Sequence, residues 1–120
     1  MKPTILFVDD EVINLFVLKK RFENDYEVLT AESGEEAIEI IRENAVNINA
    51  VISDLRMPGI DGLELINQAK EILPDTPFFL LTGYENNEQI TNALSEGLIT
   101  SSFKKPFDHG VINRKLQETL

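Results

Sequence analysis

The sequence predicts an α/β protein in which five strands alternate with five helices. Short apolar runs of about four residues are separated by longer segments whose apolar residues recur at helical spacing. Proline and glycine mark several junctions between them, among these Pro58, Gly59, Pro74 and Gly97. Such an alternation builds one parallel sheet with right-handed crossovers and helices on both faces.

The first strand is expected at Ile5-Leu6-Phe7-Val8, an apolar run that ends abruptly at Asp9. A helix should follow over residues 12–22, since its apolar positions repeat every three or four residues. Residues 27–30 predict a second, weaker strand. The inner face of the first helix is Leu15, Leu18 and Phe22.

The second helix should begin at Ser33, because Glu36 three residues later completes a capping box. Its inner face is Ala37, Ile40 and Ile41. The third strand is predicted at Ala50-Val51-Ile52-Ser53 and ends at Asp54.

Turn residues 58–62 come next, and Asp61 can cap a third helix. Phe78-Phe79-Leu80-Leu81 is the most apolar run and predicts a fourth strand that ends at Thr82-Gly83. The inner face of the third helix is Leu65, Ile66, Ala69 and Ile72.

A fourth helix with Ile90, Ala93 and Leu94 inside should stop at Gly97. Residues 98–103 predict a fifth strand of mixed polarity, as expected at a sheet edge, which Pro106 ends. Asp108 can cap the last helix. Its inner face is Ile112, Leu116 and Leu120.

Composition and charge narrow the functional classes. Of the 120 residues, 42% are hydrophobic, so the chain can bury a core without disulfides or a structural metal. It has no cysteine, which excludes a thiolate metal site. The net charge is −10, from 21 acidic and 11 basic residues. This excess of carboxylates argues against direct binding to nucleic acid.

No repeat, low-complexity tract or linker interrupts the chain, so we expect one domain over residues 1–120. The first apolar run is too short for a signal peptide or a membrane span, and we expect a soluble, cytoplasmic protein without a membrane partner. A stand-alone protein and a domain of a longer regulator or hybrid kinase both stay open. Met1 favours an intact N-terminus.

Polar residues directly follow or end four of the predicted strands. These are Asp9 and Asp10 after the first strand, Asp54 after the third, Thr82 after the fourth and Lys105 after the fifth. The carboxyl ends of parallel strands lie on one rim of a sheet, which is where open α/β sheets bind their ligands. We therefore expect these side chains to converge.

Three converging carboxylates repel one another. At ~4 Å a like-charged pair costs about 4 kcal/mol at an effective dielectric of about 20, so the cluster requires a cation, a lysine or a shifted pKa. Oxygen ligands with open water positions suit Mg²⁺. Together with Lys105, Mg²⁺ would balance the three charges and meet a phosphoryl group on Asp54. Asp54 is then the nucleophile, and the Thr82 hydroxyl is a candidate sensor of the phosphate.

The motifs resemble the signature of two-component response-regulator receiver domains, in order and over essentially the whole chain. They are Asp9-Asp10, Asp54-Leu55-Arg56-Met57-Pro58-Gly59-Ile60-Asp61-Gly62, Thr82-Gly83 and Lys105-Pro106. The resemblance implies a flavodoxin-like (βα)5 three-layer sandwich with a parallel five-stranded sheet of order 2-1-3-4-5. It also implies a phosphorelay function, in which Asp54 takes a phosphoryl group from the phosphohistidine of a sensor histidine kinase or a phosphotransfer protein. The phosphoprotein then signals to a downstream protein target or an attached effector.

The same resemblance implies the ligands of the metal. Asp10, Asp54 and the backbone carbonyl of Arg56 bind Mg²⁺, with Asp9 close by or bound through water. The domain would catalyse its own phosphorylation and dephosphorylation as a signalling switch, and not act as a turnover enzyme.

Two further roles follow from the resemblance. Thr82 shifts towards the phosphoryl group, and Lys105 forms a salt bridge to it. Lys104 competes with Lys105 for this role, but the adjacent Pro106 favours Lys105. The Lys105–Pro106 bond is similar to one that is cis in the family.

One position departs from the family pattern. The family usually carries Tyr or Phe three residues before the motif lysine, where this chain has Ser102, followed by Phe103. Alternation along a strand would point Phe103 to the other face. Either a bulge brings Phe103 round, or the protein switches without an aromatic rotamer. We expect the switch and interface surface to run from Tyr84 to Phe103 and to include Ser102 and Pro106.

Two other classes share parts of this pattern. A flavodoxin-like FMN-binding protein has the same architecture, but its loop after the first strand is rich in Ser, Thr and Gly, whereas here it is Asp9-Asp10-Glu11. A haloacid-dehalogenase-like phosphatase also uses an aspartyl phosphate and Mg²⁺. Its nucleophile opens an Asp-x-Asp motif, and it generally carries a cap insertion for which this chain has no room. A yellow colour would indicate the first alternative, and turnover of phosphate esters the second.

Overall fold

The computed structural model of the protein describes residues 2–83 and 88–120. Strands and helices alternate through these residues, as predicted. The strands are β1 (Thr4–Val8), β2 (Glu27–Ala31), β3 (Ile48–Asp54), β4 (Phe78–Thr82) and β5 (Ser101–Lys104). The helices are α1 (Val12–Phe22), α2 (Gly34–Asn44), α3 (Gly62–Ala69), α4 (Glu88–Ser95) and α5 (His109–Thr119). Tyr84, predicted to belong to the switch surface, lies outside the described residues.

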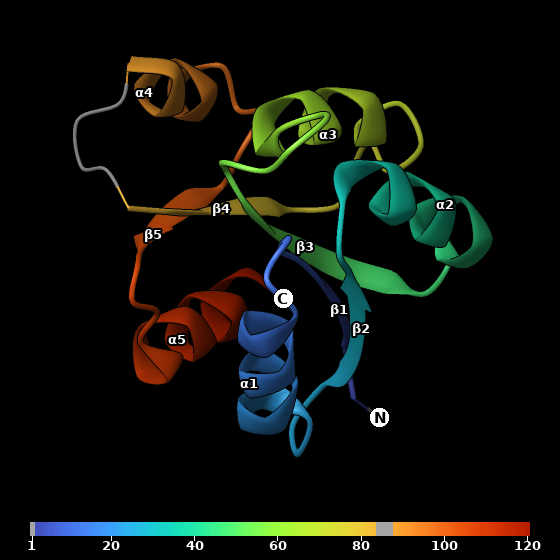
Figure 1. The fold of residues 1–120 in the computed structure, drawn as a ribbon, viewed down its shortest axis with the longest axis vertical. Helices are drawn as coiled ribbons and strands as arrows, with labels where there is room; N and C mark the ends of the chain where they lie inside the picture. The colour runs from blue at the N-terminus through green and yellow to red at the C-terminus, as the bar shows by residue number, and fades with distance from the viewer. Residues whose placement is uncertain (1, 84–87) are drawn as a thin grey trace.

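The strands form one parallel sheet in the order β2-β1-β3-β4-β5. Helices α2, α3 and α4 cover one face of the sheet, and α1 and α5 cover the other (Figure 1). This is the flavodoxin-like sandwich and the strand order that the resemblance implies. The strand order reverses between β1 and β3, since β2 and β3 lie on opposite sides of β1. A ligand site is therefore expected at the carboxyl ends of these two central strands.

The core consists of two apolar layers, one on each face of the sheet. Side chains of a parallel strand alternate between the faces, so successive residues enter different layers. Leu6 and Leu80 pack towards α2, α3 and α4, while Phe7 and Phe79 pack towards α1 and α5. Because both faces are covered, the central strands read as continuous apolar runs.

Phe103 belongs to the core layer on the α1 and α5 face. Its side chain is 7% exposed, and its ring stacks on that of Phe79 with a centroid distance of 5.6 Å. The register between β4 and β5 is continuous, with Ser102 opposite Leu80 and Phe103 opposite Leu81. No bulge brings Phe103 round, so it does not replace the missing aromatic side chain at Ser102. Ser102 itself is half-buried.

Strand β5 begins three residues later than predicted. The backbone of Leu98 and Ile99 turns back instead, and both N–H groups donate to the carbonyl of Ala93, at 2.9 and 3.4 Å. Gly97, with φ of +74°, permits this turn at the end of α4. Ile99 is buried in the core layer of the α4 face, so burial beside a helix explains the apolar pattern that indicated a strand.

Two residues assigned to inner helix faces are in fact exposed. Leu94 in α4 is 42% exposed, and Leu120 after α5 is 46% exposed. Helix α3 also ends earlier than its apolar pattern suggests, at Ala69, although Ile72 still packs against the core.

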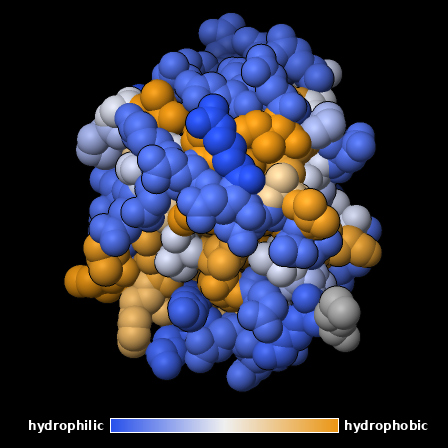
Figure 2. All heavy atoms as spheres, turned by 90° about the vertical axis from the view of Figure 1, so that its right-hand side faces the viewer, coloured by the Kyte–Doolittle hydropathy of each residue, from blue (hydrophilic) through white to orange (hydrophobic). Residues whose placement is uncertain are grey.

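Helix α1 presents apolar side chains to solvent. Val12, Ile13 and Phe16 are 58%, 76% and 62% exposed. Figure 2 shows a largely hydrophilic face on which hydrophobic atoms are exposed in several separate places, in its upper as well as its lower half. Within residues 2–83 and 88–120, no helix is both long and apolar enough to span a membrane.

Candidate functional site

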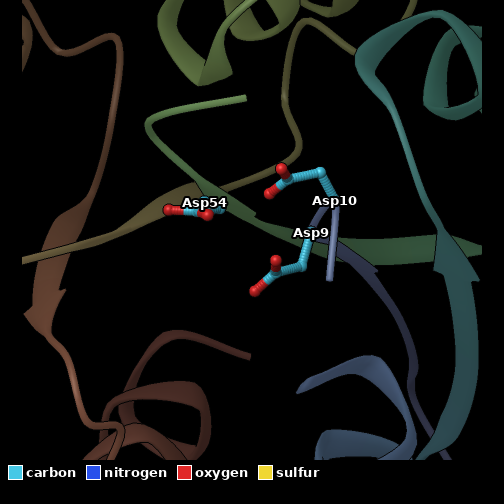
Figure 3. A group of neighbouring side chains, drawn as sticks. All are labelled: Asp9, Asp10 and Asp54. Atoms are coloured by element: carbon cyan, nitrogen blue, oxygen red, sulfur yellow. The ribbon is translucent and has the colours of Figure 1, made fainter. Parts of the chain in front are cut away.

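Three carboxylates meet where β1 and β3 end. Asp9 and Asp10 follow the last residue of β1, and Asp54 is the last residue of β3. The three side chains point into the same space from these neighbouring strands (Figure 3). One carboxylate oxygen from each lies within 4.8 Å of the others. Asp9 and Asp54 are 1% and 5% exposed, whereas Asp10 is open to solvent.

Asp9 is held in place by the start of α1. The backbone N–H of Glu11 donates to Asp9 Oδ1 at 2.9 Å, and Asn14 Nδ2 donates to Asp9 Oδ2 at 3.3 Å. No motif in the sequence marked Asn14 as a site residue. Its position in the first turn of the helix that follows the acidic pair was the available signal, since that turn begins beside the site.

Lys105 brings a cation to these carboxylates. Its Nζ lies 2.9 Å from Asp54 Oδ2 and 3.8 Å from Asp9 Oδ2. The Lys105 backbone N–H donates to the carbonyl of Thr82 at 2.8 Å, which ties the end of β5 to the end of β4. The following bond, Lys105–Pro106, is cis, as the resemblance implies. Lys104, the competing lysine, is exposed within β5.

Burial and charge act against each other at Asp54. Burial raises the pKa of Asp54, and the negative charge of Asp9 adds to this, while the hydrogen bond and charge of Lys105 oppose it. The pKa of Asp54 stays above its ordinary value. Desolvation by burial alone would lower the pKa of Lys105, but the hydrogen bond and charge of Asp54, together with the charge of Asp9, outweigh it and raise that pKa. Lys105 is therefore a permanent cation that only partly compensates the carboxylates.

Two further candidate residues lie near Asp54: Arg56 follows it in the chain, and Thr82 lies on the neighbouring strand β4. Thr82 ends β4 and is 4% exposed, one residue beyond Leu81, which pairs with Asp54. Arg56 lies in the loop after Asp54, which closes on itself through a hydrogen bond of 2.9 Å from the Gly62 N–H to the Leu55 carbonyl. Both residues thus lie close to the acidic cluster.

The donor set matches a hard divalent cation. Every candidate ligand is an oxygen, and carboxylate and carbonyl oxygens with open water positions are what Mg²⁺ binds in proteins. Three carboxylates and one ammonium leave a formal charge of −2 in the cluster, which one divalent ion would cancel. The residues present therefore fit Mg²⁺.

The fold and this site define a doubly wound α/β protein with an acidic, lysine-paired centre at the switch point of its sheet. Residues 5–117 match the family model of the response regulator receiver domain. The chain belongs to this family, and neither the flavin-binding nor the phosphatase alternative is supported.

Individual relatives agree with this assignment. The chain is 32% identical to the transcriptional regulatory protein GlrR of Escherichia coli over 99% of its own length, but it covers only 27% of that protein. It is similar to a solved response regulator receiver domain from Clostridium thermocellum, with 31% identity, a TM-score of 0.91, and 98% and 93% of the two chains covered. A structure titled as adenylate cyclase from Rhodopirellula baltica gives 32% identity and a TM-score of 0.92, with 99% and 87% covered.

Proposed function

We propose that residues 1–120 form a phosphoryl-accepting switch in which Asp54 is the phosphorylated residue. The observation that carries this proposal is the convergence of Asp9, Asp10, Asp54 and Lys105 at the carboxyl ends of the central strands. A buried carboxylate beside two others and a lysine is suited to attack a phosphorus atom when cations are close by. Membership of the receiver family supports the same assignment.

In this proposal one carboxylate oxygen of Asp54 forms a bond to phosphorus. The bond from phosphorus to the donor's leaving group breaks, and its electron pair goes to the leaving group. Lys105 lies 2.9 Å from Asp54 and neutralises charge on the incoming phosphoryl group. The Thr82 hydroxyl, at the end of the adjacent strand, donates a hydrogen bond to a phosphoryl oxygen and thereby senses the phosphoryl group.

Asp10, Asp54 and the Arg56 carbonyl are the proposed Mg²⁺ ligands, with Asp9 nearby or bound through water. A bound Mg²⁺ supplies positive charge to the phosphoryl oxygens. Asp9 accepts hydrogen bonds from Glu11 and Asn14, which fixes its orientation beside the metal position. The protein's own side chains therefore determine where the acceptor oxygen lies.

The proposed donor is a histidine-phosphorylated kinase or phosphotransfer protein, and the proposed receiver of the signal is a downstream protein or an attached effector. Helix α1 begins beside Asp9 and Asp10 and exposes Val12, Ile13 and Phe16, a surface on which a protein donor could dock next to the acceptor. GlrR, of which the chain spans about a quarter, is a transcriptional regulator. We propose that phosphorylation acts through a signalling switch and not through turnover of a substrate.

An acyl phosphate donor tests this function directly. With Mg²⁺ present, the intact protein should gain the mass of one phosphoryl group, and Asp54→Asn should gain none. Asp75→Asn, which removes an equal charge at an exposed position outside the cluster, is the matched control and should be phosphorylated like the wild type. A wild type that gains no mass, or an Asp54→Asn variant that still does, would overturn the proposal.

A further inference from the structure

The first residue of α2, Gly34, lies in direct contact with the loop that follows Asp54. A Cβ atom on Gly34 would overlap Cγ1 of Ile60 and would lie 2.7 Å from its Cδ1 and 3.2 Å from its carbonyl oxygen. Among the described glycines, positive φ angles occur at Gly59 and Gly97, so Gly34 does not need glycine for its backbone conformation. Glycine is needed here because the helix approaches the loop so closely.

A second contact joins the same helical turn to the same loop. Glu35, the next residue of α2, places its Oε2 atom 2.7 Å from where a Cβ on Gly59 would lie, so its carboxylate covers Gly59. The turn itself is held by two hydrogen bonds: Ser33 Oγ accepts from the Glu36 N–H at 3.0 Å, and Glu36 Oε1 accepts from the Glu32 N–H at 2.9 Å. The amino end of α2 is therefore a well-fixed support for the loop.

Two backbone hydrogen bonds fix the base of the loop. The Leu55 N–H donates to the Leu81 carbonyl at 3.0 Å, and the Gly62 N–H donates to the Leu55 carbonyl at 2.9 Å. These bonds hold the two ends of the loop beside Asp54. Between them, Ile60 packs against the core layer of the α2 face. Arg56 lies in the same loop, four residues before Ile60.

We propose that Gly34 and Ile60 are positioning residues for the metal site. Their close packing sets the loop that carries the Arg56 carbonyl, and this inference rests on the proposed function, in which that carbonyl is a ligand. Mg²⁺ requires near-octahedral geometry at about 2.0–2.1 Å, so a small displacement of one ligand lowers its affinity. Residues that orient metal ligands typically change affinity by about 10- to 100-fold when they are replaced.

The direct test is Gly34→Ala, with Mg²⁺ affinity measured on the unphosphorylated protein by titration of its amide NMR signals. The added methyl group should displace Ile60 and weaken Mg²⁺ binding by about 10-fold. Gly110→Ala is the matched control, because Gly110 is exposed in the first turn of α5 and a Cβ there would meet only Asp108 Oδ1, at 3.3 Å. The control should keep the wild-type affinity.

Ile60→Ala removes the contact from the side of the loop without adding volume. Alone it should also weaken Mg²⁺ binding, because the loop loses its support. Combined with Gly34→Ala it should add little further loss, since both changes act through one contact and their effects should not be additive. Fully additive losses would mean that the two residues act separately, which would overturn the proposal.

The remaining outcomes separate this inference from the proposed function. If folded Gly34→Ala binds Mg²⁺ as tightly as the wild type, the positioning role is wrong. If Gly34→Ala does not fold, Ile60→Ala decides, and unchanged affinity in that variant rejects the role. Mg²⁺ binding that Asp10→Asn abolishes but neither Gly34→Ala nor Ile60→Ala weakens leaves the metal site standing and removes only this inference. A wild type that binds no Mg²⁺ removes both.

Discussion

Asp54 lies between two requirements that conflict. A nucleophilic carboxylate must be ionised and held in a fixed position. Burial at the end of β3 fixes the position of Asp54, but it also raises the pKa and so disfavours the ionised form. Lys105 offsets part of this cost through its contact of 2.9 Å, while Asp9 adds to the repulsion. The site is therefore built for the arrival of further positive charge, and without it the ionised form of Asp54 is unfavourable.

This conflict predicts a pH-dependent gain in stability for Asp54→Asn in the absence of divalent ions. The pKa of Asp54 in the folded protein is raised above its ordinary value of 3.8, so the cost of ionising Asp54 in the folded state appears as the pH rises above 3.8 and is complete once the pH exceeds the folded pKa. Below 3.8 the side chain is protonated in both states and this cost is absent. Asp54→Asn should therefore unfold at a higher temperature than the wild type at neutral pH, and the difference should shrink on acidification.

Thermal unfolding in a chelating buffer, followed by circular dichroism at several pH values, measures the difference in unfolding temperature between Asp54→Asn and the wild type. Asp75→Asn, at an exposed position outside the cluster, corrects for the general loss of one negative charge. A variant that is less stable than the wild type at neutral pH, or whose advantage grows as the pH falls, contradicts the argument.

In strand β5, neighbouring residues face opposite sides of the sheet and have different roles. Phe103 faces α1 and α5 and stacks on Phe79, whereas Ser102 faces the other way and is half-buried. The aromatic ring of this strand thus contributes to the core. The face of the sheet that α2, α3 and α4 cover carries a small hydroxyl at Ser102, where the resemblance led us to expect an aromatic ring.

Substitutions in β5 should separate these two tasks. Phe103→Ala should lower the free energy of unfolding by about 3–5 kcal/mol, because it removes a buried ring and leaves a cavity. Ser102→Ala should change it by only about 0.5 kcal/mol, as is usual away from tightly packed positions. Chemical denaturation measures both. A larger loss for Ser102→Ala than for Phe103→Ala would show that the assignment of faces is wrong.

The same strand shows what the sequence can and cannot predict. Alternation alone put Phe103 and Ser102 on opposite faces, because the side-chain period of a strand is fixed. The start of β5 was missed, since an apolar residue such as Ile99 has the same signature whether it is buried in a strand or beneath a helix. Gly34 was missed as well, because its role comes from a contact with Ile60, and closeness between residues far apart in sequence is set only by the folded chain.

For the whole molecule, topology explains why the convergence of these side chains could be predicted from the sequence. Asp9, Asp54 and Lys105 are far apart in sequence, but a parallel sheet of this order brings the ends of their strands to one rim. Once the alternation of strands and helices is recognised, the convergence of these residues follows. Which oxygen of each carboxylate faces the others, and how deeply each lies, depends on packing and needed the structure.

If Mg²⁺ binds at this rim, it should also stabilise the whole domain, which carries a net charge of −10. Binding of Mg²⁺ to the folded state alone stabilises it by mass action, by about 2.7 kcal/mol when the free ion is at about 100 times its dissociation constant. We therefore predict that the melting temperature rises with Mg²⁺ concentration and continues to rise above the dissociation constant.

Asp10→Asn should largely remove this rise, because Asp10 is the proposed ligand that is exposed to solvent, and its replacement costs no core packing. Asp75→Asn should keep it, since it lowers the overall charge equally at a distant exposed position. This comparison distinguishes a bound ion from general screening, which would act on both variants alike. Equal Mg²⁺ responses in the two variants would mean that the ion does not bind at the rim.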